Sequence, residues 1–347
     1  MVLRRVSLAL LSTCVLGLSL TVARAQEPDE IALKVGPADH AAAAQATLVY
    51  RHAKPTSLPN GQAHRDALFG LRASAASADD SEGGYGSLRY PGDLTYQGGK
   101  VVQETVFHAI YLLPNGSCPI STCWGNPERF LRDYGRSEMI HITDQYVGTT
   151  ANHRYTVGTR AKFSFPPQST PLTDADILTI VYATATALGD TGYGHLFHVF
   201  LPPGTDECFD STFTSCYSPD NPSSFVFCAY HSSFDYKGNH YLYSVEPYQD
   251  VPGCRVRPGT PNGQLIDSTN NSLSHETTET ITDPDGDAWI NSTLVVLSGA
   301  EIGDECSFYT VQGQNAYFDP SNVILNDKPY AIQPEYDNFR HACSTAP

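Results

Sequence analysis

The sequence predicts an α+β fold, a single disulfide-containing domain in which one polar helix packs on a sheet. From about residue 96, segments typical of strands and helices follow one another irregularly, without the regular β-α-β order of a parallel sheet. Cysteines are spread through this region, and residues 274–284 have His and Glu residues at helical spacing. The domain would cover residues 96–347, roughly 250 residues, which is a common domain size.

Residues 1–25 have the features of a secretory signal peptide. A basic pair at residues 4–5 precedes an apolar run over residues 6–22, and Ala-Arg-Ala at 23–25 has the small-residue pattern of a cleavage site. The apolar run is too short to span a bilayer, and no later segment reaches that length. We therefore expect a secreted protein, extracellular or periplasmic, without a membrane span.

Eight cysteines remain after such a cleavage, and an even number in an exported chain predicts disulfide bonds. None of them has the C-x-x-C spacing of zinc ribbons or thioredoxin-like motifs. Because the sequence alone allows many pairings, we take the simplest, in which near neighbours pair. The expected disulfides are Cys118–Cys123, Cys208–Cys216, Cys228–Cys254 and Cys306–Cys343.

Residues 26–95 differ in composition from the rest of the chain. They include the Ala-rich stretch ADHAAAAQATLVY and the linker-like stretch SASADDSEGGYGSLRYPG, and they contain no cysteine. We expect a loosely structured N-terminal segment or a prosegment. The alternative is a helix that packs on the main domain.

Several later segments have clear element patterns. VVQETVFHAIYLLPNG alternates and ends in a Pro-Asn-Gly turn, which predicts a strand. DADILTIVYATATALG has apolar residues at helical spacing and ends at Gly189, which predicts a helix. HLFHVFLPPG and SSFVFCAYHSSF predict buried strands, and the residues between them predict a surface loop held by a disulfide.

The stretch SHETTETITDP differs by one residue from the zinc-peptidase signature H-E-x-x-H, because Glu279 replaces the second His. On a helix, His275 and Glu279 lie one turn apart and point the same way, and Glu276 flanks that face. Asp283-Pro284 would end the helix, since proline disfavours α geometry in the residue before it. Thr-Glu-Thr-Ile-Thr also suits a strand, but we prefer a zincin-like active-site helix packed on the sheet.

A third metal ligand is expected from SGAEIGDEC, which contains Glu301 and Asp304. One of these carboxylates would bind the ion and the other would orient His275, because a ligating His usually has such a partner. We favour Glu301 as the ligand. Zn²⁺ is the first choice of ion because the spacing resembles that of zinc peptidases, and the oxygen ligands leave Mn²⁺ and Fe²⁺ open. Alternatively, His275 and the two acids are ordinary solvated residues.

Three other groups have weaker patterns. DPDGD has aspartates at alternate positions, as calcium loops do, but lacks the terminal Glu of an EF-hand, so a turn after the helix is preferred. His195 and His198 lie at odd spacing on a predicted strand and are expected to have structural roles. His231 is a further candidate ligand whose spacing does not decide its role.

SHETTETITDPDGDAWI, followed by GAEIGDECSF and by FRHACS, resembles the phosphate-induced protein 1 family, also called EXORDIUM-like, and its bacterial relatives. The resemblance covers about residues 88–347 and is most specific from Ser274 to Cys306. It implies an exported protein of a family associated in plants with cell-wall growth. Some members lack the His-Glu pair, so the resemblance alone does not imply metal chemistry. This chain has all five candidate ligand and base residues.

The net charge of −16 is unlike that of proteins that bind nucleic acid or anionic lipid. We hypothesise an exported metal-dependent hydrolase, a zincin-like peptidase that acts on a peptide or protein substrate. Glu276 would take a proton from the attacking water. The alternative is a non-catalytic extracellular or cell-wall protein that binds polysaccharide and has a structural or vestigial metal site.

Overall fold

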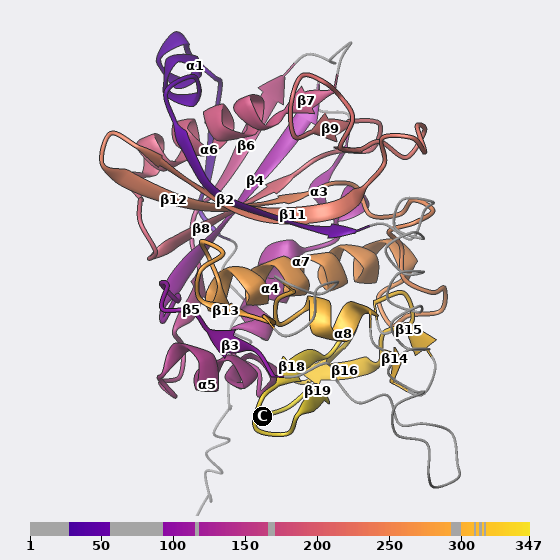
Figure 1. Ribbon diagram of the computed structural model, residues 1–347. Helices are drawn as coiled ribbons and strands as arrows, with labels where there is room; N and C mark the ends of the chain where they lie inside the picture. The colour runs from indigo at the N-terminus through magenta and orange to yellow at the C-terminus, as the bar shows by residue number, and fades with distance from the viewer. Residues whose placement is uncertain are drawn as a thin grey trace, which may run out of the picture.

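A computed structural model shows the chain folded around an eight-stranded sheet (Figure 1). It describes residues 28–55, 93–114, 118–165, 171–292, 300–308, 310–311, 314–315 and 317–347. The expected signal peptide therefore lies outside the described residues, as does most of the second half of the N-terminal segment.

The helices and strands follow one another as the chain runs. The strands are β1 Glu30–Leu33, β2 Thr47–Pro55, β3 Thr95–Tyr96, β4 Thr105–Pro114, β5 Tyr155–Val157, β6 Arg160–Phe165, β7 Leu172–Thr173, β8 His195–Phe200, β9 Glu207–Cys208, β10 Cys216–Tyr217, β11 Phe227–Tyr236, β12 Asn239–Glu246, β13 Trp289–Ile290, β14 Thr310–Val311, β15 Gln314–Asn315, β16 Asn322–Leu325, β17 Lys328–Ala331, β18 Glu335–Asp337 and β19 Ala342–Ser344. The helices are α1 Pro37–Ala43, α3 Ile120–Cys123, α4 Pro127–Tyr134, the 3₁₀ helix η1 Met139–Thr143, α5 Asp144–Val147, α6 Asp174–Leu188, α7 Gln264–Thr282 and α8 Asp304–Phe308.

The large sheet has the strand order β1-β6-β4-β8-β12-β11-β2, and β5 pairs with β4. Neighbouring strands from β1 to β12 are parallel, whereas β11 is antiparallel to both β12 and β2. Helix α6 provides the crossover between β6 and β8, which flank β4 in the sheet. The fold is therefore mixed α+β as expected, but its parallel part was not apparent from the irregular order of elements.

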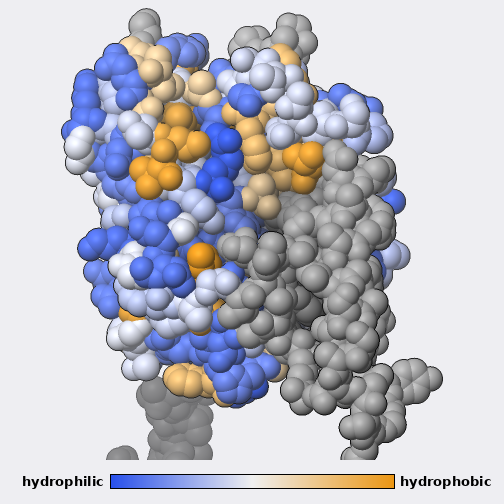
Figure 2. All heavy atoms as spheres, in the orientation of Figure 1, coloured by the Kyte–Doolittle hydropathy of each residue, from blue (hydrophilic) through white to orange (hydrophobic). Residues whose placement is uncertain are grey.

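Helices cover both faces of this sheet (Figure 1). α1 and α6 pack together on one face, and α4 and α7 lie on the other. Each face has its own apolar core, with Trp124 and Tyr134 fully buried on the α7 face and Ile177 and Val181 fully buried on the α6 face. None of the described helices is both long and apolar enough to cross a membrane. Hydrophilic residues cover most of the coloured surface in Figure 2.

The expected element ends and disulfides are confirmed. Helix α6 ends at Gly189, whose φ of 79° is left-handed and favours glycine, and α7 ends just before Asp283. The four expected pairs of cysteines are all present, as Cys118–Cys123, Cys208–Cys216, Cys228–Cys254 and Cys306–Cys343. The loop before β11 is held by the second of these pairs, as predicted.

Residues 28–55 of the N-terminal segment form β1, α1 and β2, and both strands join the large sheet, which corrects the expectation of loose structure for these residues. Apolar residues explain this, because Ala42 is buried and Ile31 and Leu33 pack against the α6-side core. Strand β2 forms one edge of the sheet. Residues 56–92 lie outside the described residues. The prosegment role stays a prediction.

Candidate metal centre

Helix α7 is buried along most of its length although most of its side chains are polar. Every residue from Asp267 to Thr282 is buried. Many of its hydroxyl groups bond within the helix: those of Ser268, Thr278 and Thr280 donate to the carbonyl four residues earlier. Such local bonds satisfy buried hydroxyls without outside partners. The helix can therefore lie between the sheet and the C-terminal part of the chain and still present charged groups.

The five residues predicted from the motif meet in one cluster. His275, Glu276 and Glu279 lie on α7, and the segment leading into α8 brings Glu301 and Asp304 to the same place. His275 Nε2 is 3.0 Å from Glu279 Oε1 and 3.7 Å from Asp304 Oδ1. Ligand atoms bound tetrahedrally to zinc lie about 3.4 Å apart, as follows from metal–ligand bonds of about 2.0–2.1 Å. His275 Nε2 therefore lies at about this spacing from one carboxylate oxygen of each acid.

Asp304 and Glu301 differ in which side chains they face. The Asp304 backbone N–H donates to Glu279 Oε1 at 3.1 Å, so the α8 start is attached to the ligand face of α7. Glu301 Oε1 instead accepts a hydrogen bond of 3.0 Å from Tyr50, and its Oε2 lies 3.6 Å from His231 Nε2. The geometry favours Asp304 as the ligand and Glu301 as the acid that supports the ligands without binding the ion. This is the reverse of the assignment favoured by the sequence.

Strand β2 contributes two side chains that the sequence analysis missed. His52 pairs with His231 across β2 and β11, and Tyr50 pairs with Ser233, so both point to the α7 side of the sheet. His52 Nε2 lies 2.6 Å from Asp304 Oδ2. His52, Glu279 and Asp304 together satisfy the spacing of a metal site. The only trace in the sequence is the alternation of TLVYRHAK, which places Tyr and His on one face of a strand.

His231, left undecided by the sequence, lies inside the cluster. Its Nδ1 is 3.4 Å from Glu276 Oε2 and 3.7 Å from Glu279 Oε2, and these three residues form a second group with metal-site spacing. Its ring stacks on His52 with centroids 5.7 Å apart. Burial lowers the pKa of His231 to about 4, although nearby Glu279 opposes this. The ring is therefore neutral at pH 7, as a ligand or hydrogen-bond partner requires.

The cluster contains one charged histidine, His52, and more than one carboxyl group close to it. Burial lowers the pKa of His52, but Asp304 and the α7 glutamates outweigh it and raise this pKa to about 10. Burial raises the pKa of Asp304, but His52 outweighs it and lowers this pKa to about 2. Burial and the carboxylates of Asp283 and Glu279 raise the pKa of Glu301 well above its usual range. A protonated Glu301 and a charged His52 thus offset part of the negative charge, which a divalent cation would also do.

Close packing holds the His275 ring in place. A Cβ atom at Gly303 would lie 2.6 Å from His275 Nδ1 and 3.0 Å from Glu279 Oε1, so a side chain there would collide with both. Ser307 Oγ lies 3.4 Å from the same Nδ1. Contacts on Nδ1 leave Nε2 directed at the carboxylates, the usual arrangement of a metal-binding His.

The aspartates after α7 act as a turn, which is the interpretation preferred from the sequence. Asp283 Oδ1 accepts the backbone N–H of Ala288 at 2.7 Å. Asp285 accepts hydrogen bonds from Tyr193 and from Ser233, the latter at 2.6 Å. These bonds fix the chain that leaves α7.

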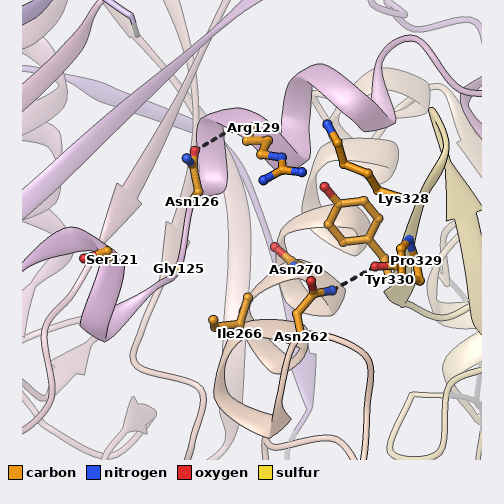
Figure 3. A pocket seen from close by; sticks show the side chains of 10 residues that line it. All are labelled: Ser121, Gly125, Asn126, Arg129, Asn262, Ile266, Asn270, Lys328, Pro329 and Tyr330. Carbon is orange, nitrogen blue, oxygen red and sulfur yellow. Dashed lines mark hydrogen bonds between the residues drawn. The ribbon is translucent and has the colours of Figure 1, made fainter. Parts of the chain in front are cut away.

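A pocket of about 390 Å³ lies beside the other end of α7 (Figure 3). It is lined by Ser121, Gly125, Asn126, Arg129, Asn262, Ile266, Asn270, Lys328, Pro329 and Tyr330. No residue of the cluster lines it, so this pocket gives no access to the candidate metal ligands.

Comparison with known proteins adds no relative. No model of a protein family, no curated protein and no solved structure matches the chain. The resemblance to the phosphate-induced protein 1 family therefore stays a prediction, and the interpretation of the cluster rests on its geometry.

Proposed function

We propose that the protein is an exported metal-dependent hydrolase, a zincin-like peptidase. In this structure its own N-terminal strand β2 would cover the active site. The main support is the meeting of His275, Glu279 and Asp304 in one buried cluster beside Glu276. Buried carboxylates are unfavourable unless they are paired or bind a metal. An ion between these ligands would account for their arrangement.

The side chains divide into ligands and a base. His275, Glu279 and Asp304 would hold Zn²⁺, and His52 would add a fourth ligand in this closed form. When bound, the ion would polarise a substrate carbonyl and acidify water. Glu276 would take the proton of the attacking water and return it to the leaving amine. His231 would hold the Glu276 carboxylate in position. Two carboxylate ligands reduce the ion's charge, which leaves Mn²⁺ and Fe²⁺ as alternatives.

The closed state follows from where β2 lies. The side chains of His275, Glu276, Glu279 and His231 are fully buried, and β2 covers them with Tyr50 and His52. In the described sheet, β2 is held along β11 alone. Its departure would make β11 the sheet edge, and an extended peptide could pair with that edge in its place. This geometry supports the prosegment interpretation of the N-terminal residues.

The same burial favours a second candidate function. A cluster that is fully enclosed and completed by His52 would also suit a structural metal in a non-catalytic extracellular protein, one that binds wall polysaccharide or a protein partner. The two candidates differ in the expected effect of opening the cluster by removing His52. A peptidase should become more active, whereas a structural metal site should show no activity.

Metal analysis and two substitutions test the proposal. Protein purified without added ions, and then dialysed against Zn²⁺, Mn²⁺ or Fe²⁺, should contain metal. With a mixed peptide library, His52→Ala should raise turnover, because it removes the covering ligand. When combined with His52→Ala, Glu276→Gln should keep the metal and lower turnover by about 100-fold or more relative to His52→Ala alone.

Val49→Thr is the matched control for His52→Ala, because Val49 lies on β2 and its side chain is 41% exposed. It should change neither metal content nor turnover. Protein that takes up none of the three ions would end the metal hypothesis. Metal-loaded protein that stays inactive with and without His52 would favour the structural role.

A further inference from the structure

A second set of metal-type ligands lies away from the α7 cluster and shares no residue with it. His108 lies on β4, His195 begins the neighbouring strand β8, and Asp190 lies in the turn that joins α6 to β8. One ligand atom from each comes within 4.8 Å of the other two. We propose that these three side chains form a second binding site, for a divalent transition-metal ion.

The hydrogen bond made by His108 fixes which nitrogen faces the site. Its Nδ1 lies 2.9 Å from the Thr159 carbonyl oxygen. A carbonyl can only accept, so Nδ1 carries the proton and Nε2 presents its lone pair. Nε2 lies 3.2 Å from His195 Nδ1 and 3.4 Å from Asp190 Oδ2. These separations match the spacing of about 3.4 Å expected for ligands around a tetrahedral zinc ion.

Hydrogen bonding among the three side chains explains the arrangement less well. His108 Nε2 and the Asp190 carboxylate are both acceptors, so neither can donate to the other. If neutral His195 donates from Nδ1 to His108, its Nε2 is bare and faces Asp190 Oδ1 at 3.6 Å, beyond hydrogen-bond distance. A positive charge among the three groups, either a second proton on His195 or a metal ion, would remove these unfavourable contacts, and the number of bound ions distinguishes the two.

The surrounding backbone holds two of the ligands rigidly. The N–H groups of Gly189 and Asp190 both donate to the Ala185 carbonyl, so Asp190 is fixed just beyond the C-terminus of α6. The negative end of the helix dipole disfavours a carboxylate there and favours a nearby cation. A Cβ atom at Gly158 would lie 2.7 Å from His108 Cε1, so the chain leaves room for this ring only with glycine at that position.

Solvent can reach this site, in contrast to the α7 cluster. The side chains of His195 and Asp190 are 24% and 27% exposed, whereas that of His108 is 3% exposed. Water can therefore complete the coordination of an ion held by the three protein ligands. Two imidazoles and one carboxylate suit Zn²⁺ and related transition metals better than Ca²⁺ or Mg²⁺, which prefer oxygen ligands.

Counting bound ions in the full chain tests this site. Equilibrium dialysis against Zn²⁺, repeated with Co²⁺ to record its ligand-field absorption, gives the number of ions per chain. Asp190→Asn and His195→Asn should each bind one ion fewer than the unchanged protein. Both positions are partly exposed. Thermal unfolding identifies a variant that fails to fold, and the ion count of the other variant then tests the site.

Two further variants separate this site from the α7 centre. Glu279→Gln should remove only the ion of the α7 centre, and Glu279→Gln combined with Asp190→Asn should remove both. His153→Asn is the matched control, because His153 is exposed and its φ of 60° is one that Asn tolerates. An unchanged ion count in folded Asp190→Asn and His195→Asn would overturn the second site, whatever Glu279→Gln does.

Discussion

The two acids of the segment that leads into α8 face different partners, and this separates their expected roles. Asp304 Oδ1 faces His275 at 3.7 Å, whereas Glu301 is engaged by Tyr50 and His231. Asp304→Asn should therefore lose metal on dialysis, because it removes a ligand. Glu301→Gln should retain most of it, with an affinity weaker by about 10- to 100-fold at most, as for other residues that only support ligands. Atomic absorption after dialysis measures both. Metal loss from Glu301→Gln alone would restore the assignment favoured by the sequence.

Glu207, which bonds to Tyr230 of the α6-side core, provides a pH-dependent effect on stability. It is fully buried on β9, and burial raises its pKa to about 8 despite the hydrogen bond from Tyr230 and the nearby Arg51. In the unfolded chain a glutamate titrates near pH 4.3. Because the folded pKa is the higher one, the stability linked to this proton is complete below about pH 4.3 and lost as pH rises to about 8.

Glu207→Gln should remove this dependence, because the amide stays neutral at every pH. At pH 9 the variant's free energy of unfolding in urea should exceed that of the unchanged protein by up to about 5 kcal/mol, since the folded and unfolded pKa values differ by about 3.7 units and one unit is worth about 1.4 kcal/mol. The two curves should approach each other near pH 5. Glu104→Gln, at an exposed position, should have no such effect. Parallel pH curves for Glu207→Gln and the unchanged protein would contradict the raised pKa.

At the scale of elements, α7 tolerates burial because its hydroxyls bond to its own backbone. Thr278 is different from Thr280, since it also contacts the fully buried Tyr134 hydroxyl at 2.6 Å. Thr278→Val should lower the free energy of unfolding by about 1–3 kcal/mol, because a buried hydroxyl loses its partner. Thr280→Val removes only a bond within the helix and should lower it by less than about 1 kcal/mol. Urea titration compares them, and equal losses would contradict this account.

Features set by nearby residues were predictable from the sequence. Gly189 ends α6 and Pro284 follows the end of α7, because a left-handed φ at glycine and the steric restriction that proline places on the preceding residue both act locally. The motif likewise placed His275 and Glu279 on one helical face. By contrast, the parallel order of β4, β8 and β12 depends on pairing between distant segments, which local patterns do not encode. His52 was missed for the same reason, because only the pairing of β2 with β11 brings it to α7.

At the scale of the whole molecule, the candidate centre depends on three separate regions of the chain. The edge of the sheet contributes β2 and β11, α7 contributes the motif, and the C-terminal part contributes α8, whose first residue bonds to Glu279 of α7 (Figure 1). No one of these regions forms the cluster alone. Loss of the C-terminal contacts should therefore affect metal binding as well as stability, and the disulfide between Cys306 and Cys343 gives a way to test this.

This disulfide connects the segment of Asp304 to the C-terminal hairpin. Cys306 lies in α8, Cys343 lies in β19, and the Tyr336 N–H of β18 donates to the Ile302 carbonyl at 3.1 Å. Cys306→Ala combined with Cys343→Ala opens a loop with a sequence separation of 37. Chain entropy predicts a loss of at most about 4 kcal/mol in the free energy of unfolding. Metal affinity should fall too, because Asp304 is no longer tethered to the hairpin.

Cys208→Ala combined with Cys216→Ala is the matched control. This disulfide closes a shorter loop, with a sequence separation of 8, and joins β9 to β10, neither of which contributes a residue to the cluster. The same chain-entropy relation predicts a loss of about 2.5 kcal/mol. Its metal affinity should match that of the unchanged protein when both are measured well below their melting temperatures. Equal weakening in the two double variants would mean that metal binding follows general stability, and the proposed tether of Asp304 would then be wrong.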